Sequence, residues 1–404
     1  MNALVVVRRE LRALWGDGAG KSLVVIAGGW GLLLGARMIY PVLLPYFRES
    51  FGLSLTVAGV LVTILWLGSA VGQLPGGVLA DRYSERLMMT IAAVVVAVAL
   101  VVVATAPTAV VLFVATGLLG LGQSLYPIAR ITILASIYPD RIGSALGVTM
   151  ATGDLGQTVL PPIAGTLAIA IAWQAGLLFL VPFLAIAAVA LWVTLPQETG
   201  GNTDSGADAL SLEAARTVLA EIRRANLGFV AFILFLYILI WQSFTGFYPT
   251  YLVEEKGLDT STAALLFSLF FAMGVIVKPV AGAAYDRIGI RGSLVLVLSG
   301  PVAGFLLLPV LSSFWSLVAV TALVSTMLGS GAITQSFLAD AFSAEIRGTG
   351  LGVVRTATAT LGAMGPVLFG VIADRGYFDE GYVILGVIML VVIGLTLRLP
   401  KPSS

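Results

Sequence analysis

The sequence contains no histidine and no cysteine, and only 11% of its 404 residues are charged. Without these two residue types a chain has no imidazole base, no thiol nucleophile, no disulfide and no conventional zinc site. An ordinary soluble domain has about 25% charged residues. The low charge and the 59% hydrophobic content therefore indicate an integral membrane protein. We expect it not to be an enzyme and to bind no metal or cofactor.

Basic clusters are also missing, and the net charge is only +1. Nucleic-acid binding requires a dense basic patch, so nucleic acid is not an expected partner. The first apolar run, 23–46, is about twice as long as the core of a signal peptide, and no convincing cleavage site follows it. We expect this run to be retained as a membrane span in the lipid bilayer.

Twelve segments are long enough to cross a bilayer as helices, which takes about 20 mostly apolar residues. They are 23–46, 55–80, 87–106, 108–134, 143–169, 174–195, 228–251, 261–285, 293–311, 314–338, 349–373 and 381–399. The expected organisation is a cytoplasmic segment 1–22, a six-helix bundle 23–195, a cytoplasmic linker 196–227 with a short amphipathic helix, a second six-helix bundle 228–399 and a cytoplasmic tail 400–404.

The distribution of basic residues predicts the orientation of these spans. With both termini in the cytoplasm, fifteen of the 22 Lys and Arg residues fall on the inner side and three on the outer side. Loops rich in Lys and Arg stay inside. The sequence therefore predicts a multi-pass protein of the cell membrane with cytoplasmic termini. Four basic residues remain within spans: Arg37, Arg130, Lys278 and Arg355.

The second half of the chain repeats the first at an offset of 205 residues without a gap. Matching pairs are Tyr46 with Tyr251, Glu49 with Glu254, Gly77 with Gly282, Asp81-Arg82 with Asp286-Arg287, Arg86 with Arg291, Pro161 with Pro366 and Gly165 with Gly370. Parallel six-span repeats are one architecture by which transporters place a central site between rocking halves. The predicted fold class is an all-α membrane protein of two parallel six-helix repeats.

The loop after the second span reads Gly77-Val-Leu-Ala-Asp-Arg-Tyr-Ser-Glu-Arg86, and its repeat reads Gly282-Ala-Ala-Tyr-Asp-Arg-Ile-Gly-Ile-Arg291. Both resemble the signature loop of the major facilitator superfamily, although Ser84 stands where that family usually has glycine. The resemblance implies the twelve-helix fold of that family and secondary transport by alternating access. It also implies a cytoplasmic gate formed by Gly77, Asp81, Arg82, Arg86, Gly282, Asp286, Arg287 and Arg291. Charged loops that only fix the topology are the alternative.

Span 5 resembles part of the motif of proton-coupled drug antiporters. It carries Gly147, Gly156 and Gly165 at the motif's spacing, but Leu160 and Ala164 replace two of its glycines. Small residues and prolines in membrane helices also serve close packing. The resemblance therefore gives only slight support to export in exchange for protons.

In the superfamily, spans 1, 4, 7 and 10 line the central cavity, and here they carry polar residues. In span 4, three of these residues follow one another at i, i+3 and i+7 and share a helix face. The candidate substrate-binding residues are Arg37, Tyr40, Gln123, Tyr126, Arg130, Trp241, Gln242, Thr245 and Ser325. Hydrogen bonding to a neighbouring helix is the alternative for each uncharged residue among them. Arg130 and Lys278 lie near the inner ends of their spans and can also extend toward the cytoplasm.

Arg37 lies in a run that is otherwise uncharged, and a charge at the bilayer centre is penalised by about 2.5 to 3.5 kcal/mol. Helical geometry places Arg37 about 21 Å into a core about 30 Å thick. We interpret it as an anchor for the substrate, with a structural pair to Asp154 as the alternative. Asp154, the one acid deep in a span, is either a proton carrier or a permanent counter-ion of Arg37 or Arg355.

Two functions follow from these features. One is export of a small organic or amphipathic molecule in exchange for protons. The other is transport of an organic anion, because basic residues outnumber acids within the spans. A receptor derived from a transporter is a remote third possibility. We expect a monomer, in which Gly31 and Gly35 pack the first span against another span of the same chain.

Overall fold

The computed structural model describes residues 14–16, 19–196, 227–341 and 347–399, and within them all regular structure is helical. The predicted linker, apart from its two end residues, and the predicted tail lie outside the described residues. The first half comprises α2 (Ala19–Phe51), α3 (Leu55–Val71), α4 (Gln73–Arg82), α5 (Glu85–Ala104), α6 (Ala109–Ser124), α7 (Tyr126–Ile137), α8 (Ile142–Ala170), α9 (Ala175–Leu178) and α10 (Leu180–Thr194).

The second half has the same order of helices. It comprises α13 (Leu227–Glu254), α14 (Thr260–Leu307), α15 (Phe314–Ser325), a 3₁₀ turn (Thr326–Leu328), α16 (Gly329–Ala341), α17 (Arg347–Gly362), α18 (Gly365–Asp374) and α19 (Phe378–Thr396). All twelve predicted spans fall on these helices. Of the described helices, nine are individually long and apolar enough to cross a membrane, and α14 contains two predicted spans. The all-α fold class is confirmed.

Several spans are interrupted near a proline or a glycine. The predicted second span is divided into α3 and α4 at Gly72, and the fourth into α6 and α7 next to Pro127. The eleventh span breaks in the same way before Pro366, at the start of α18. Proline lacks an N–H and fits best in the first turn of a helix, so these positions favour a new helical segment.

The two copies of the signature loop turn by different means. Gly289 adopts φ 67° and ψ −179°, a left-handed conformation that glycine reaches without a Cβ clash. Ser84, in the first copy, is extended, with φ 179°, and its hydroxyl accepts a hydrogen bond from the Leu87 N–H at the start of α5. The serine is therefore compatible with its turn, and it caps the helix that follows.

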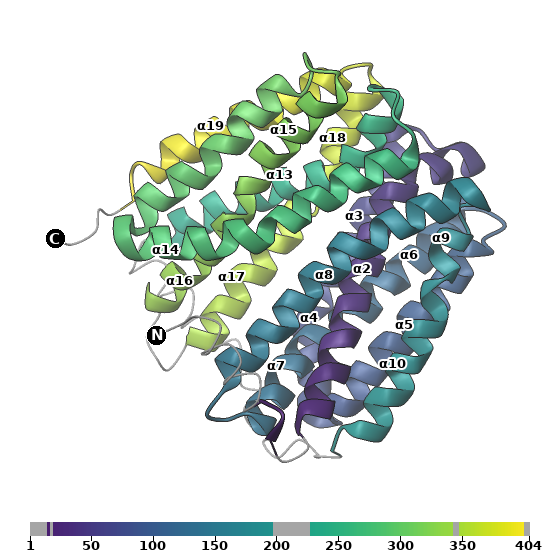
Figure 1. The fold of residues 1–404 in the computed structure, drawn as a ribbon, viewed down its shortest axis with the longest axis vertical. Coiled ribbons are helices and arrows are strands. Elements are labelled where there is room, and N and C mark those ends of the chain that lie inside the picture. Colours follow the sequence, from purple (N-terminus) through teal and green to yellow (C-terminus); the bar gives the residue numbers. More distant parts are fainter. Residues whose placement is uncertain (1–13, 17–18, 197–226, 342–346, 400–404) are drawn as a thin grey trace.

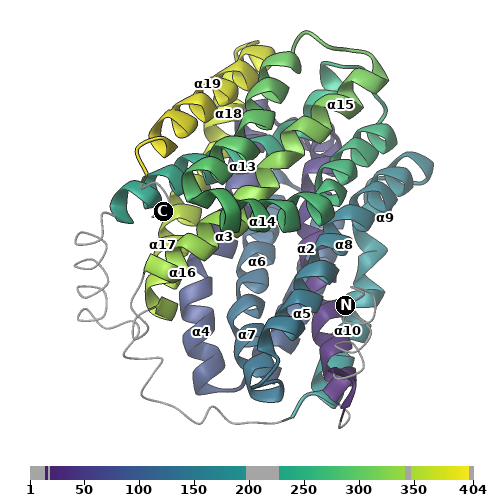
Figure 2. The same ribbon diagram turned by 60° about the vertical axis from the view of Figure 1, so that its left-hand side comes forward.

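The helices of each half lie together, and α8 and α14 run side by side where the halves meet (Figures 1 and 2). Polar contacts between the halves gather at one end of the molecule, near connections 52–54, 255–259 and 375–377, which we call the closed end. The contacts there include an Arg48–Glu254 ion pair, a bond from the Leu55 N–H to Asp374 (3.0 Å), a bond from Thr260 to Tyr46 (3.2 Å) and a Thr166–Ser261 bond (3.1 Å). In the predicted orientation, the closed end faces the outside.

Small residues allow the close packing of α2 on α8. A Cβ added to Gly31 would lie 2.7 Å from the carbonyl oxygen of Thr152, and one added to Gly35 would lie 2.7 Å from that of Gly156. Nothing larger than glycine fits either position without a shift of the backbone. The predicted packing of the first span through Gly31 and Gly35 is confirmed, and this contact fixes the position of the helix that carries Arg37.

Candidate binding cavity between the two halves

A cavity of about 310 Å³ lies beside α2. Its described lining consists of Trp30, Leu33, Leu34, Arg37, Ser69, Gln73, Gln123, Pro127, Gln157 and Arg355. Nine of these ten residues belong to the first half, and Arg355 of α17 belongs to the second. The described lining contains two guanidinium groups and no carboxylate, so the cavity carries a formal charge of +2. A positive cavity within a membrane favours an anionic ligand.

Arg37 lies over an aromatic ring instead of beside an acid. Its Cζ atom is 4.4 Å from the centroid of the Trp66 ring, and the Trp66 and Trp241 rings meet edge to face at 5.0 Å. Within the described part of the chain, Arg37 Nε has no hydrogen-bond partner. A desolvated cation–π contact stabilises a guanidinium by about 2 kcal/mol without neutralising it. The charge of Arg37 therefore remains available to a ligand.

Arg355 supplies the second positive charge. Its side chain is exposed at the cavity, and among the described residues no side chain forms an ion pair or hydrogen bond with its guanidinium. The main chain of Arg355 is ordinary helix, and its carbonyl accepts a hydrogen bond from Thr358. The two halves thus present one guanidinium each to the same cavity.

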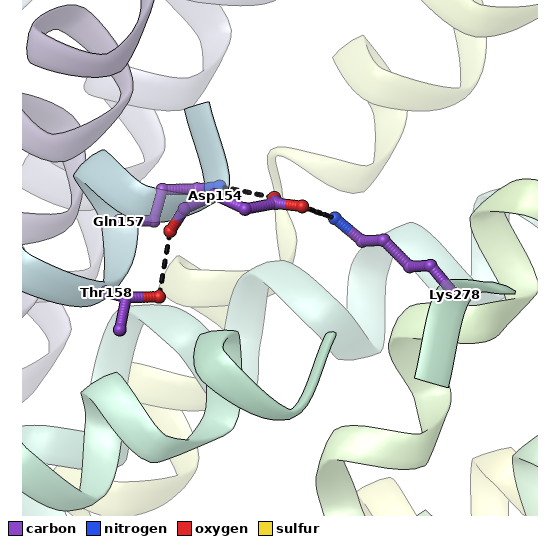
Figure 3. Close-up of polar contacts among 4 residues, drawn as sticks. All are labelled: Asp154, Gln157, Thr158 and Lys278. Atoms are coloured by element: carbon purple, nitrogen blue, oxygen red, sulfur yellow. Dashed lines mark hydrogen bonds and ion pairs between the residues drawn. The ribbon is translucent and has the colours of Figure 1, made fainter. Parts of the chain in front are cut away.

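Asp154 pairs with Lys278, which corrects the partner expected from the sequence. Lys278 Nζ lies 2.6 Å and 2.7 Å from the two carboxylate oxygens, and the pair joins α8 to α14 across the two halves (Figure 3). Pairing of Asp154 with Arg37 or Arg355 is therefore wrong for this structure. The lysine, expected to reach toward the cytoplasm, instead turns toward the other half because an acid lies opposite it.

Three glutamines of the cavity lining share a polar network with neighbouring groups. Gln123 Nε2 donates to the carbonyl of Leu33 (2.9 Å), as expected for a residue at the cavity. Gln73 and Gln157 are not among the predicted substrate-binding residues. Gln73 Nε2 donates to the carbonyl of Ser69 (3.1 Å), and Gln157 Nε2 donates to Asp154 Oδ1 (3.4 Å). Their sequence signal is a strongly polar amide in an apolar run.

Several predicted substrate residues lie outside the described cavity lining. Tyr40 is buried and bonds to Thr116 Oγ1 (2.9 Å), whereas Tyr126 donates to the carbonyl of Ile26 (2.8 Å). The hydroxyls of Thr245 and Ser325 donate to carbonyls of their own helices, and Trp241 is one ring behind Trp66. Gln242 is buried, and Gln242 Oε1 has no partner in the described part of the chain.

Arg130 is also removed from the cavity by one layer of side chains. Its Nη1 donates to Thr149 (2.5 Å), and its Cζ lies 4.3 Å from the centroid of the Trp30 ring. Tyr126 stacks on the same indole at 6.0 Å. Trp30 itself lines the cavity, so Arg130 and Tyr126 support the cavity wall from behind.

The residues of the predicted gate lie at the ends of α4, α5 and α14 on the side opposite the closed end. Arg86 stays within its own half, where its Cζ lies 4.3 Å from the Trp192 ring centroid and its Nη1 donates to the carbonyl of Leu195 (3.4 Å). Arg82, Asp286 and Arg287 are exposed. The remaining members are Gly77, Gly282 and Arg291, and the side chain of Asp81 lies outside the described set. The gate stays a prediction.

Known proteins resemble this chain over most of its length. It is 27% identical over 380 residues to the hexuronate transporter of Bacillus subtilis (strain 168), with 89% of each chain covered. It is 25% identical over 383 residues to the probable sulfoacetate transporter SauU of Cupriavidus necator, with 87% of each covered. The structure superimposes on that of the nucleoside transporter NupG with a TM-score of 0.79 at 14% identity, covering 93% of this chain and 98% of the other.

The sequence model described as Major Facilitator Superfamily matches residues 25–338 and 230–404. These ranges include both six-helix halves and both copies of the signature loop. The structure agrees with the match, since its helices form two halves of the same order. The chain therefore belongs to the Major Facilitator Superfamily and is a multi-pass membrane transporter.

Proposed function

We propose that this transporter carries small organic anions by alternating access. The observation that carries the proposal is the cavity charge: Arg37 and Arg355 enter it from opposite halves, and its described lining contains no acid. Paired guanidiniums bind carboxylate and related oxyanions through charge-assisted hydrogen bonds. Hexuronate and sulfoacetate, which the two named relatives transport, are both organic anions, and this supports the assignment.

Binding to residues of both halves suits the transport cycle. The closed end seals one entrance, so an anion enters from the other side, which we place in the cytoplasm together with both termini. An anion held between Arg37 and Arg355 offsets the repulsion of two like charges as the halves approach. The substrate thereby stabilises the closed intermediate through which the protein changes direction, and a single chain contains the whole site.

The ion pair of Asp154 favours the anion carrier over the proton-coupled exporter. A carboxylate that binds Lys278 through both oxygens is held in its charged form, so it is less suited to pick up and release a proton. The partial antiporter motif of span 5 lies where Gly156 packs against α2, and close packing accounts for that glycine.

Counterflow in proteoliposomes tests the proposed function. Vesicles loaded with unlabelled glucuronate should take up labelled glucuronate in a saturable manner, and neutral glucose should not compete. Arg37→Gln and Arg355→Gln should each lower uptake at least tenfold. Arg375→Gln is the matched control, because Arg375 is an exposed arginine that bonds only to the carbonyl of Val371 in its own helix. Uptake of neutral solutes with no preference for anions would refute the proposal.

A further inference from the structure

Two amides of the cavity have a fixed orientation. Gln73 Nε2 faces the carbonyl oxygen of Ser69, and Gln157 Nε2 faces a carboxylate oxygen of Asp154. Both partners only accept hydrogen bonds, so the NH₂ group of each amide must point to them. The acceptor atom Oε1 of each glutamine is consequently left over, and within the described residues no donor satisfies it.

The ion pair with Lys278 strengthens this assignment for Gln157. Lys278 donates to both oxygens of Asp154 and keeps the acid ionised, so that it cannot turn into a donor itself. Figure 3 shows the carboxylate between the lysine of one half and the glutamine next to the cavity. Lys278 and Asp154 are thus positioning residues for Gln157.

Gln123 differs from these two amides. Its Nε2 donates to the carbonyl of Leu33 (2.9 Å), and its Oε1 accepts from the hydroxyl of Ser69 (3.4 Å). Both ends of this amide are used inside the protein. Gln123 therefore holds α6 against α2 and α3, whereas Gln73 and Gln157 each keep one acceptor for a ligand.

The cavity thus combines donors that suit an anion with acceptors that suit a hydroxyl group. A carboxylate on a plain hydrocarbon body accepts hydrogen bonds from the arginines but has nothing to donate to Gln73 and Gln157. A buried acceptor that loses water without gaining a donor weakens binding. Sites that are built for a substrate hydroxyl reject analogues that lack it.

We propose that the substrate is a hydroxylated organic acid of the sugar-acid class, whose hydroxyl groups donate to Gln73 and Gln157 while its anionic group binds Arg37 and Arg355. This proposal rests on the anion-carrier function above and narrows its substrate. A cavity of about 310 Å³ is at the small end of ligand pockets, which span about 300 to 1,000 Å³, and this size fits a single sugar ring.

A pair of acids with the same charge and ring size tests the inference on the purified full chain. Glucuronate has a six-membered ring, one carboxylate and several hydroxyls, and cyclohexanecarboxylate has the ring and the carboxylate alone. Calorimetry should give an affinity for glucuronate at least about tenfold higher, because two acceptors are satisfied. Glucose, which has hydroxyls and no charge, should bind more weakly than either acid.

Two variants assign the effect to the glutamines. Gln73→Leu and Gln157→Leu should each reduce the preference for glucuronate severalfold and leave the affinity for cyclohexanecarboxylate within about twofold of wild type. The comparison of ligands on the wild-type chain remains decisive if a variant does not fold. Equal affinity for the two acids would overturn this inference alone. Tightest binding of glucose, or binding of neither acid, would overturn the anion-carrier function as well.

Discussion

Asp374, the last residue of α18, accepts a hydrogen bond from the main-chain N–H of Leu55, the first residue of α3, at 3.0 Å. Its second oxygen accepts from the hydroxyl of Thr56 at 2.8 Å. The first N–H groups of a helix have no partner within the helix, and the partial positive charge there favours a carboxylate. One acid of the second half thus caps a helix of the first half, and this contact must break when the closed end opens.

Asp374→Ala should make the closed end open more often. The chain has no cysteine, so Ala264→Cys, at a position buried against Gly165 of the other half, introduces a single thiol. Loss of two partly exposed hydrogen bonds, at about 0.5 to 1.5 kcal/mol each, should raise its labelling rate by a maleimide at least severalfold. Glu380→Ala removes an exposed acid at the same end and should leave the rate unchanged. Equal labelling of all three proteins would contradict the capping role.

Asp154 and Lys278 should behave as a coupled pair. Removal of one partner leaves the other as an uncompensated charge next to hydrocarbon, whereas removal of both leaves none. Asp154→Asn and Lys278→Met should each lower the thermal unfolding temperature more than the double variant does. The coupling free energy should be about 1 to 3 kcal/mol. Additive effects in a double-mutant cycle would show that the pair contributes no stability.

Asp259 gives the fold a dependence on acidic pH. Hydrogen bonds from the side chain and the main-chain N–H of Thr262 hold the pKa of this helix-capping carboxyl below its usual value. Its stabilising contribution is therefore fully present above about pH 4, the pKa in an unfolded chain, and is lost as the pH falls through the lower pKa of the folded state. Wild type should unfold at a higher temperature than Asp259→Asn at pH 6, and the gap should shrink toward pH 3. A constant gap would contradict this assignment.

The two signature loops should differ in their tolerance to substitution. Gly289→Ala places a Cβ on a residue with φ 67° and should destabilise the protein by about 1 kcal/mol or more. Ser84→Gly keeps an extended conformation that any residue adopts and replaces one acceptable capping residue with another, so it should cost only a few tenths of a kcal/mol. Thermal unfolding of both variants provides the comparison, and a larger loss for Ser84→Gly would be inconsistent with these backbone conformations.

The fold could be predicted from the sequence because its determinants are local. Apolar length defines the spans, and the Asp-Arg pairs of the repeat define their order. Gly31 and Gly35 announced a close helix contact because nothing but small size explains their spacing. The kink at Gly289 falls in the short polar connection between two predicted spans, so a continuous helix α14 does not alter the topology.

The cavity could be predicted only in part. Arg37, Gln123 and Arg355 line it, and each carries a strong polar signal in an apolar run. Gln73 and Gln157 were missed because their role depends on which helices meet, and span position alone does not give that. Tyr40 shows the opposite error. Its hydroxyl looked available in the sequence, but Thr116 satisfies it within the first half.

The same pairing occurs in the second half, which explains a further false candidate. Thr321, which the 205-residue offset aligns with Thr116, bonds to Tyr248 of α13. Each half therefore joins its first and fourth spans by a tyrosine–threonine bond. Polar residues on these spans served internal packing twice, so a polar stripe alone did not identify the substrate site.

Binding of glucuronate to wild type and to Arg37→Gln tests the central claim most directly. The claim is that the uncompensated guanidinium of Arg37 anchors an organic anion. Isothermal calorimetry on the two purified proteins should show an affinity at least about tenfold lower for the variant, since a charge-assisted hydrogen bond contributes about 1.5 to 3 kcal/mol. The thermal unfolding temperatures without ligand should be similar, which separates binding from folding. Equal affinity of wild type and Arg37→Gln would contradict the account.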